Sequence, residues 1–535
     1  MAKARSKFAG VDEHARTIAK AIANGQLPQP TPEIEQFLEQ RPVDLLAAAD
    51  GVCRHIPPAG DDETLGIGYL FLLQMLLERA RFRAERGFKD AAELLATFQA
   101  ALVTRAEAGE IDGNMLAYLG GALQQAKVAA SPELIAISAK LGLEDEETML
   151  PADIERALDQ ILEASDDDPF SLVGLFAEGG HTLPDEAKAA LVMHLAVDHR
   201  PAARAAAVLC LLDPSEAGRD AAAAGLLQTA ALLSPVDLRR LIAMRNWRPE
   251  HERPEVDAII QKMRAAGVAC AAWDKTVVNA LRASPVDGSN AQLFHLLSPA
   301  GRRKRLSSIL TRNGIVDAFT TDPQTSRAVA YAVEATGGGV RMLDVGRPYL
   351  DRMVSHHLAQ TLASGKVPLA GLLEVAEVIG GADWQPQQID FREALDQLIA
   401  ELPEDLRDPE AVDIVLADSD VILGLDEIED SWFEDDAELR EKMRSVSRRA
   451  HEQFVTELLL GDGAIAVRRK QWAELFVQTA LWMREAPDEY EMSWTDLAIV
   501  ARAVLEGYDL TRIGLMRNIA ERTVVVLSDE TDDEA

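Results

Sequence analysis

The stretch Asp198–Ala207, DHRPAARAAA, is followed fifteen positions later by a second Asp that opens residues Asp213–Ala224, DPSEAGRDAAAA. Each copy has an Arg six residues after its Asp (Arg204 and Arg219) and then a run of alanines. Alanine has the highest helix propensity, and its small side chain lets helix axes approach closely. The repeat therefore predicts successive helices, each begun by an Asp, that stack through their alanine faces.

This pattern resembles the HEAT-repeat family, whose motif has an Asp in the turn between two helices and an Arg in the following helix. The resemblance covers residues 191–244. The copies lie fifteen residues apart, so they mark single helices and not complete two-helix repeats. For this part of the chain the resemblance implies an array of helices stacked side by side, with an extended binding surface.

At several places along the chain, a turn residue is followed by Pro and then by an amphipathic segment. Pro suits the first position of a helix, and a preceding Ser, Thr or Asp caps the free amides beside it. On this basis we expect helices to begin at Thr31, Ser131, Asp213, Ser234, Ser284 and Ser298.

Between these positions the apolar residues follow a helical period. In RRKQWAELFVQTALWM (residues 468–483), the side chains three or four apart share one face: Trp472, Leu475, Phe476, Thr479 and Trp482. Alternating patterns typical of strands are scarce, and TVVVL (residues 523–527) continues a helical stripe. The fold class expected is therefore all-α, an α-solenoid or a multi-bundle of stacked antiparallel helices.

Changes in composition suggest four segments. They are an N-terminal helical region (residues 1–165), an alanine-rich HEAT-like array (166–385), a C-terminal helical region with an acidic segment (386–527) and an acidic tail (528–535). The tail is expected to be disordered because it has almost no apolar residues to bury.

The net charge of −34 is the strongest signal in the composition of these 535 residues. Such a surface repels phosphate backbones, which disfavours nucleic acid, and it attracts basic proteins or simply maintains solubility. Three cysteines far apart in sequence fit reduced residues of a cytoplasmic protein. The N-terminus has no apolar signal stretch, and the apolar run at residues 65–77 is too short to cross a bilayer, so we expect a buried helix and no membrane association.

One acidic segment, residues 408–438, contains no Lys or Arg. We expect its carboxylates to form a docking surface for a protein partner, such as a basic protein, although a merely solvated surface is the alternative. The residues of this acidic surface are Asp418, Asp420, Asp426, Glu427, Glu429, Asp430, Glu434, Asp435 and Asp436. The spacing approaches a calcium loop, but Ile422 takes a ligand position and Gly424 comes one place late, so no metal is expected.

A short basic run, opposite in charge to the acidic segment, is the candidate anion-binding site. It consists of Arg302, Arg303, Lys304 and Arg305, whose side chains suit phosphate, with pairing to acidic residues of the same chain as the alternative. The sequence has no phosphate-binding Walker loop, no His-Glu-x-x-His and no Gly-x-Ser-x-Gly, so no cofactor is expected and the catalytic residues, if any, are unknown.

These observations favour a cytosolic helical scaffold or adaptor that binds a protein partner through its acidic surface. The alternative is an enzyme or a nucleic-acid-acting protein with a local basic site, and a structural subunit of a larger assembly is a third reading. The sequence leaves the oligomeric state open.

Overall fold

The computed structural model describes residues 9–23, 34, 37–38, 45–56, 63–85, 88–146, 162, 165, 167–179, 185–274, 278–337, 340–381, 384–420, 428, 431–435, 437–486 and 494–533. The chain divides into two compact units. Unit 1 comprises residues 1–209 with 220–222, and unit 2 comprises residues 210–219 and 223–535. This division does not coincide with the boundaries expected at residues 165/166 and 385/386.

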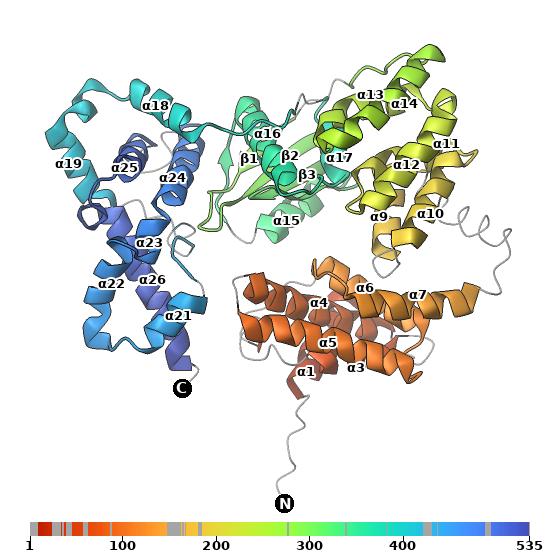
Figure 1. The fold of residues 1–535 in the computed structure, drawn as a ribbon, viewed down its shortest axis with the longest axis horizontal. Helices are drawn as coiled ribbons and strands as arrows, with labels where there is room; N and C mark the ends of the chain where they lie inside the picture. Colours follow the sequence, from red (N-terminus) through yellow and green to blue (C-terminus); the bar gives the residue numbers. More distant parts are fainter. Residues whose placement is uncertain are drawn as a thin grey trace, which may run out of the picture. The chain divides into compact units, whose positions relative to one another are not determined.

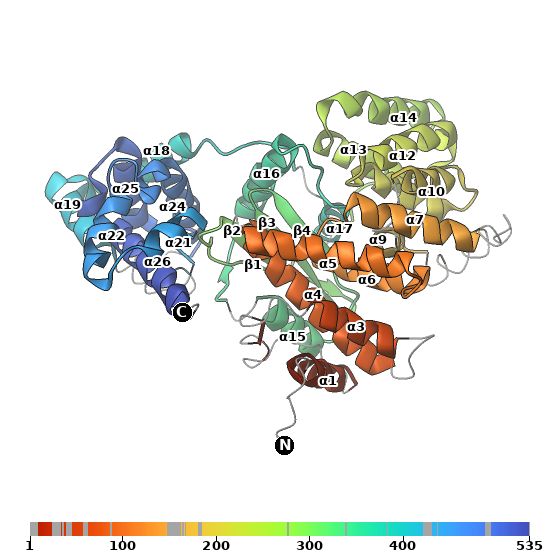
Figure 2. The ribbon, with the colours of Figure 1, turned by 60° about the horizontal axis from the view of Figure 1, so that its bottom comes forward.

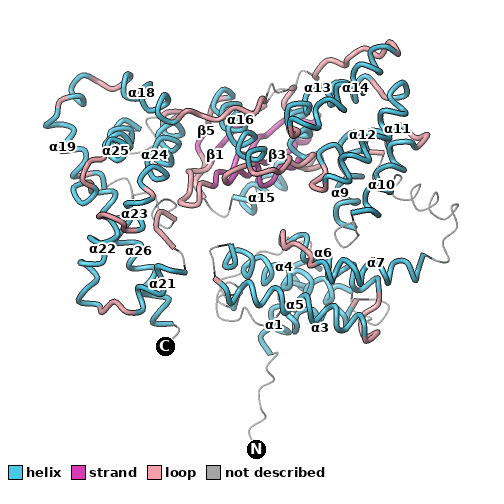
Figure 3. Tube along the Cα trace, viewed as in Figure 1, coloured by secondary structure: helices cyan, strands magenta, loops and turns pink. Residues whose placement is uncertain are grey.

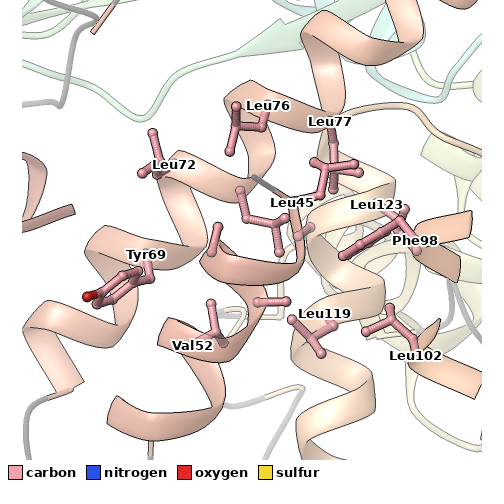
Figure 4. Packing of buried hydrophobic residues seen from close by; sticks show 14 of the residues in the cluster. Leu45, Val52, Tyr69, Leu72, Leu76, Leu77, Phe98, Leu102, Leu119 and Leu123 are labelled. Carbon is pink, nitrogen blue, oxygen red and sulfur yellow. The ribbon is translucent and has the colours of Figure 1, made fainter. Parts of the chain in front are cut away.

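Unit 1 is helical in its described residues. Its helices are α1 (Ala9–Ala23), α3 (Leu45–His55), α4 (Glu63–Glu85), α5 (Lys89–Glu107), α6 (Gly113–Gln125), α7 (Pro132–Glu146), α9 (Pro169–Gly179), α10 (Asp185–Val197) and α11 (Pro201–Leu209). The apolar run at residues 65–77 lies in α4, where Leu72, Leu73, Leu76 and Leu77 are fully buried, so the expected buried helix is confirmed. Figure 4 shows Leu72, Leu76 and Leu77 packed with residues of α3, α5 and α6. Leu73 belongs to the same core. None of the described helices is both long and apolar enough to cross a bilayer.

A five-stranded antiparallel sheet forms the centre of unit 2 (Figure 1). Its strands are β1 (Ala280–Ala283), β2 (Ala291–Ala300), β3 (Arg303–Arg312), β4 (Ile315–Thr320) and β5 (Leu343–Asp344), in the order β4-β3-β2-β1-β5. All strands of the described chain belong to this sheet (Figure 3). The fold is therefore mixed α and β, and the predicted all-α solenoid is wrong.

The expected helix starts at Ser284 and Ser298 are both wrong, and the backbone shows why. Ser284 extends the ladder beyond β1 by donating its N–H to the carbonyl of Leu293 (2.9 Å). Pro299 lies within β2 opposite Lys304, whose backbone N–H and carbonyl bond Gln324 instead. Proline at such a position removes no ladder bond, so it is tolerated inside the strand.

Helices cover both faces of the sheet (Figures 1 and 2). Helix α15 (Ser326–Gly337) reaches one face, where Thr336 bonds His295 of β2 (2.9 Å). Helix α16 (Arg347–Ala363) lies on the other face, where the ring of Tyr349 is 6.2 Å from that of Phe294. Helix α17 (Gly371–Val378) packs on β4 so closely that a Cβ on Gly371 would lie 1.8 Å from the carbonyl oxygen of Ala318.

Further helices precede and follow the sheet in unit 2. Those before it are η1 (Cys210–Leu212), α12 (Glu216–Thr229), η2 (Ala230–Leu232), α13 (Pro235–Met244), η3 (Arg245–Trp247), η4 (Glu250–Glu252) and α14 (Arg253–Ala265). Those after α17 are α18 (Phe391–Glu401), η5 (Glu404–Arg407), α19 (Pro409–Ala417), α21 (Ala437–Arg444), η7 (Arg448–Ala450), α22 (His451–Leu459), α23 (Ala464–Val467), α24 (Arg469–Met483), α25 (Trp494–Glu506), η8 (Leu510–Arg512) and α26 (Gly514–Asp533). Helix α26 confirms the helical reading of residues 523–527, and it runs to Asp533, into the tail expected to be disordered.

The two Asp copies do precede helices α11 and α12, and their arginines act alike. Arg204 donates to the backbone carbonyl of Asp198 (2.6 Å), and Arg219 donates to that of Asp213 (2.9 Å). Each Arg thus satisfies a carbonyl in the turn before its own helix. Among the other expected starts, Ser234 forms a capping box that begins α13. Ser131 caps α7, while Thr31 lies outside the described residues.

Candidate functional site

A polar cavity of about 450 Å³ in unit 2 is the candidate site. Its walls come from turns at one end of the sheet, from α16, from the start of α18, from the segment before α21 and from α24. The lining residues are Gly288, Ser289, Asn290, Asn313, Gln360, Phe391, Phe433, Glu434, Arg468, Gln471, Trp472, Glu474, Leu475 and Gln478. Amides, carboxylates and aromatic rings therefore dominate the lining.

Two asparagines in neighbouring turns form the sheet side of the cavity. Asn290 precedes β2 and Asn313 joins β3 to β4, with φ angles of 63° and 51°. Asparagine adopts this left-handed conformation more readily than most residues. The Asn290 amide donates to Oδ1 of Asn313 (3.0 Å), which fixes both side chains. Oδ1 of Asn290 is then buried without a hydrogen-bond partner among the described residues.

A buried carboxylate, Glu434, also lines the cavity. Glu434 is only 5% exposed, and its Oε1 accepts from the indole of Trp472 (2.9 Å) while Oε2 pairs with Arg468. Its backbone N–H donates to the hydroxyl of Thr523 on α26 (2.9 Å). Such paired, hydrogen-bonded burial is what a charge in the interior requires.

The chain around Glu434 is held against the sheet by close backbone contacts. A Cβ on Gly288 would lie 1.9 Å from the carbonyl oxygen of Ser431, so only glycine fits there. The indole of Trp432 donates to the carbonyl of Val286 (3.1 Å), and that of Trp482 on α24 donates to the carbonyl of Ala283 (3.1 Å). These bonds fix the acidic segment and α24 relative to the turn that carries Asn290.

Helix α24 presents two further polar side chains, Glu474 and Gln478, one turn apart. Gln478 is 2% exposed, and its Oε1 has no hydrogen-bond partner among the described residues. Glu474 is half-buried, and its partner is Lys470 on the same helix, 3.7 Å away. Burial raises the pKa of the Glu474 carboxyl, and Lys470 opposes this only in part.

Gln360 on α16 is oriented from behind by a buried histidine. Its Oε1 lies 2.8 Å from Nδ1 of His357, a side chain that is fully buried. Burial lowers the pKa of His357 to about 3, so the ring is neutral near pH 7. With an oxygen as its partner, Nδ1 carries the proton, and the amide NH₂ of Gln360 is left for other partners.

A second cavity of about 400 Å³ adjoins the first. Phe391 and Glu474 line both cavities. The second also includes Arg392 and Lys470, which adds positive charge near the shared wall. Together the two cavities offer room for a ligand of more than one small group.

A larger hollow of about 1010 Å³ lies among α18, α19 and α25. Its polar groups already satisfy one another, since Tyr508 donates to Asp413 (2.8 Å) and Arg502 pairs with Glu506 (2.9 Å). We therefore place the candidate site in the polar cavity and not here.

The acidic residues expected to form a docking surface are in different environments. Asp418 and Asp420 are exposed after α19, whereas Glu434 is buried and Asp435 pairs with Arg440 (2.6 Å). The remaining members lie outside the described residues: Asp426, Glu427, Glu429, Asp430 and Asp436.

The basic run lies at the tight turn between β2 and β3. Arg302, Arg303 and Arg305 are exposed, and Lys304 is half-buried. Arg303 donates to the carbonyl of Pro323 (3.1 Å), and no ion pair joins the four side chains to acidic residues within the described part of the chain. The structure thus gathers the four cations at one exposed hairpin end.

One described group has the composition of a metal site, namely Glu216, His251 and Glu252. Glu252 is 3% exposed and already pairs with the guanidinium groups of Arg219 and Arg248, both at 2.7 Å. These arginines neutralise the carboxylate that a cation would need, so we assign no metal to this group.

The comparisons with known proteins give two partial matches. Residues 184–267 match a family model described as the Y4lR second domain, and residues 392–528 match one described as the Y4lR C-terminal helical domain. The chain is also similar to the uncharacterized protein y4lR of Sinorhizobium fredii (strain NBRC 101917 / NGR234), with 27% identity over 353 residues. That alignment covers 64% of this chain and 66% of the relative, slightly less than two thirds of its length. No solved structure matches the chain.

These matches correct the resemblance inferred from Asp198 and Asp213. The second-domain match includes both copies, and no HEAT-repeat family is among the findings. The Asp–Arg pairs are thus a local turn device in this chain, and the HEAT-like assignment is wrong. Of the candidate site, the C-terminal match contains Glu434, Trp472, Glu474 and Gln478, while Asn290 and Gln360 lie outside both matches.

The residues of the cavity were largely missed in the sequence. Asn290, Asn313 and Gln360 are scattered polar residues with no motif around them. One signal was present in α24, because Gln478 stands directly beside Thr479 in the run of buried residues from Leu475 to Met483. A glutamine within such a run indicates a polar function for that part of the helix.

Proposed function

We propose that the polar cavity binds a small molecule that presents several hydrogen-bond donors, such as hydroxyl or amino groups. The observation that carries this proposal is the pair of buried acceptors, Oε1 of Gln478 and Oδ1 of Asn290, which have no partner among the described residues. Glu474 adds a third acceptor in the same lining. The cavity is of the size that such ligands occupy.

The free energy of the orphaned acceptors supports this proposal. A buried acceptor without a partner costs about 1–3 kcal/mol, and a donor supplied by a ligand or by water removes that cost. The aromatic rings of Trp472, Phe391 and Phe433 supply apolar surface for the carbon skeleton of such a ligand. This combination of amides, a carboxylate and rings suits a polyhydroxylated molecule.

Ligand-observed NMR with the full chain tests the proposal. The probes are glucose, myo-inositol, glycerol, glucosamine and serinol, which differ in size and in the presence of an amine. At least one should show saturation transfer from the protein, and Gln478→Leu should reduce its affinity about tenfold, because the loss of one hydrogen bond of about 1.4 kcal/mol corresponds to that factor. Absence of transfer to every probe would contradict the proposal.

Two further variants distinguish a loss of binding at the cavity from a loss of binding caused by misfolding. Asn290→Gly removes the second acceptor while keeping a residue that accepts a positive φ, so the turn should persist. Gln453→Leu removes an exposed glutamine on α22, which should leave binding unchanged. If Gln453→Leu weakens binding as much as Gln478→Leu does, the cavity is not the site.

We propose, as a second function, that the protein is a scaffold or adaptor that binds a protein partner, such as a basic protein, through its acidic surface. The exposed carboxylates of Asp418 and Asp420 and the net charge of −34 support it. Charge reversal of these two residues should lower the affinity for a cationic probe such as polylysine at low salt, since exposed charges are screened within about 10 Å at 0.1 M. Unchanged affinity would contradict a role for Asp418 and Asp420.

For the alternative of nucleic-acid binding, the exposed hairpin at Arg302–Arg305 is the surface to test, by Arg302→Glu with a labelled oligonucleotide.

We also infer a reducing compartment, in keeping with the cytoplasm. Cys53, Cys210 and Cys270 are all free, and burial raises the pKa of the Cys210 thiol to about 12. A thiol held protonated in this way is unreactive.

A further inference from the structure

We propose that the ligand of the polar cavity carries a protonated amino group that pairs with Glu474. This inference rests on the proposed function, since it specifies the chemical class of the same ligand. It follows from the position of Glu474 and from the way in which the other charged groups around it are occupied.

Glu474 stands at the wall that the two cavities share. It is placed there by α24, whose preceding residues Trp472 and Ala473 are buried. Its side chain is 32% exposed, so it faces open space and not the protein interior alone. A group bound on either side of this wall therefore meets the Glu474 carboxylate.

The other carboxylate that lines the polar cavity, Glu434, is already engaged. Both oxygens of Glu434 are occupied by Trp472 and Arg468. Asp390 lines only the second cavity, where its Oδ1 accepts from the backbone N–H groups of Arg392 and Glu393 and so caps α18. Within the polar cavity, Glu474 is left as the carboxylate with capacity for another donor.

The cations near Glu474 compensate it only in part. Lys470, on its own helix, approaches to 3.7 Å but is 79% exposed, and Arg468 is committed to Glu434. Arg392, at the start of α18, lines the second cavity, and no ion pair joins it to Glu474. Burial accordingly raises the pKa of Glu474, and an ammonium group in the cavity would relieve that unfavourable desolvation.

The remaining lining favours an ammonium group over a divalent ion. Calcium and magnesium sites usually gather several oxygens that include more than one free carboxylate, and this cavity offers one. An ammonium group can donate to the carboxylate of Glu474, and the orphaned oxygens of Gln478 and Asn290 belong to residues that line the same cavity and can accept from other donors of the ligand. The rings of Trp472 and Phe391 can add cation–π attraction.

Matched pairs of probes test the inference by NMR titration of the full chain. Glucosamine differs from glucose, and serinol from glycerol, by an amino group in place of one hydroxyl. Each amine should bind at least tenfold more tightly than its hydroxyl counterpart at a pH where it is protonated. Glu474→Gln keeps an acceptor oxygen but removes the charge, so it should lower the affinity for each amine to that for its hydroxyl counterpart.

A matched control is available on α26, where the exposed side chain of Glu521 pairs with that of Arg517 one turn earlier (3.6 Å). Glu521→Gln removes one negative charge without touching the cavity, so it should preserve the preference for amines. For the wild type, the preference should increase as the pH rises through the pKa of Glu474, because the ionised carboxylate is the form that pairs.

The outcomes separate the amine inference from the proposal that the polar cavity binds a small molecule. Equal affinity for amine and hydroxyl probes, or an unchanged preference in Glu474→Gln, would overturn the present inference and leave the proposed function standing. Failure of all the probes to bind would overturn both. A preference lost equally in Glu521→Gln would show that the net charge of the protein, and not Glu474, attracts the amine.

Discussion

The indole nitrogen of Trp472 donates a 2.9 Å hydrogen bond to Oε1 of Glu434, thirty-eight residues earlier in the chain. Arg468 pairs with the other carboxylate oxygen, so the charge of Glu434 is compensated inside the protein. This arrangement draws the acidic segment against α24 and builds one wall of the cavity. A carboxylate that the sequence assigns to a docking surface thus has a structural role.

Removing the indole of Trp472 should therefore destabilise unit 2 more than removing a comparable indole. Trp472→Phe deletes a hydrogen bond to a charged group, worth about 1.5–3 kcal/mol, whereas Trp432→Phe deletes one to the neutral carbonyl of Val286, worth about 0.5–1.5 kcal/mol. Both changes remove the same volume from the same aromatic cluster. Urea unfolding followed by circular dichroism compares them, and a larger loss for Trp432→Phe would contradict this ranking.

The ion pairs of Glu252 predict a second effect on stability. Arg248 is fully buried and Arg219 is 6% exposed, and both pair with Glu252 at 2.7 Å. Glu252→Gln leaves two buried guanidinium groups without a counter-charge, which should cost about 3–5 kcal/mol. The exposed pair of Glu521 with Arg517 provides the control, because Glu521→Gln should cost less than about 1 kcal/mol. If thermal unfolding shows equal losses of stability in the two variants, then burial does not determine the cost of removing an ion pair.

Glu252 also predicts a dependence of stability on acid. Hydrogen bonds from Arg219 and the charge of Arg248 hold its pKa below the ordinary 4.5, against the opposing effect of burial. A carboxyl with a lowered pKa stabilises the folded state above its unfolded pKa, and this contribution is lost as the pH falls through the folded value. Wild-type unfolding measured from pH 6 to pH 3 should show this loss, and Glu252→Gln should show less of it.

The buried histidines of α16 predict a further loss of stability between about pH 6.5 and pH 4. Burial lowers the pKa of His356 to about 4 and that of His357 to about 3, so the unfolded chain takes up protons in this range before the folded protein does. Each such histidine contributes about 1.4 kcal/mol per pH unit to the loss. His356→Asn keeps an acceptor for the backbone N–H of Ile389 and should reduce the slope by that amount. An unchanged slope in urea unfolding would mean that His356 is not the titrating group.

Glycine at position 288 should be irreplaceable. A Cβ there would meet the carbonyl oxygen of Ser431 at 1.9 Å, so Gly288→Ala must separate the turn from the acidic segment and reduce ligand binding. Gly121→Ala, in helix α6 with no atom within 4 Å, should instead stabilise the protein by about 0.5–1 kcal/mol. Thermal unfolding distinguishes the two, and a neutral Gly288→Ala would contradict the close contact.

Much of the helical structure could be predicted because its signals are local. The cap at Ser234, the apolar face from Trp472 to Trp482 and the helix through residues 523–527 depend on neighbours a few residues apart, and all are confirmed. The sheet could not be predicted in this way. Its polar residues Gln292, His295, Ser307 and Ser308 are buried, so strands β2 and β3 lack the alternation of apolar and polar residues that marks a half-exposed strand.

The candidate site was missed for a related reason. Its residues come from two turns, three helices and the acidic segment, and only the tertiary fold brings Asn290 to Gln478. The sequence did indicate the charge of the acidic segment, but charge alone did not reveal that Glu434 would be buried against Trp472. Contacts between residues far apart in the sequence determine both the assembly of the cavity and the burial of Glu434.

A crystal structure of the full chain soaked with the best-binding probe tests the central claim most directly. The account predicts density for the probe between α24 and the turn of Asn290, with donor groups within hydrogen-bond distance of Gln478 and Asn290. A cavity filled by the protein's own side chains, or a probe bound elsewhere with this cavity empty, would contradict it.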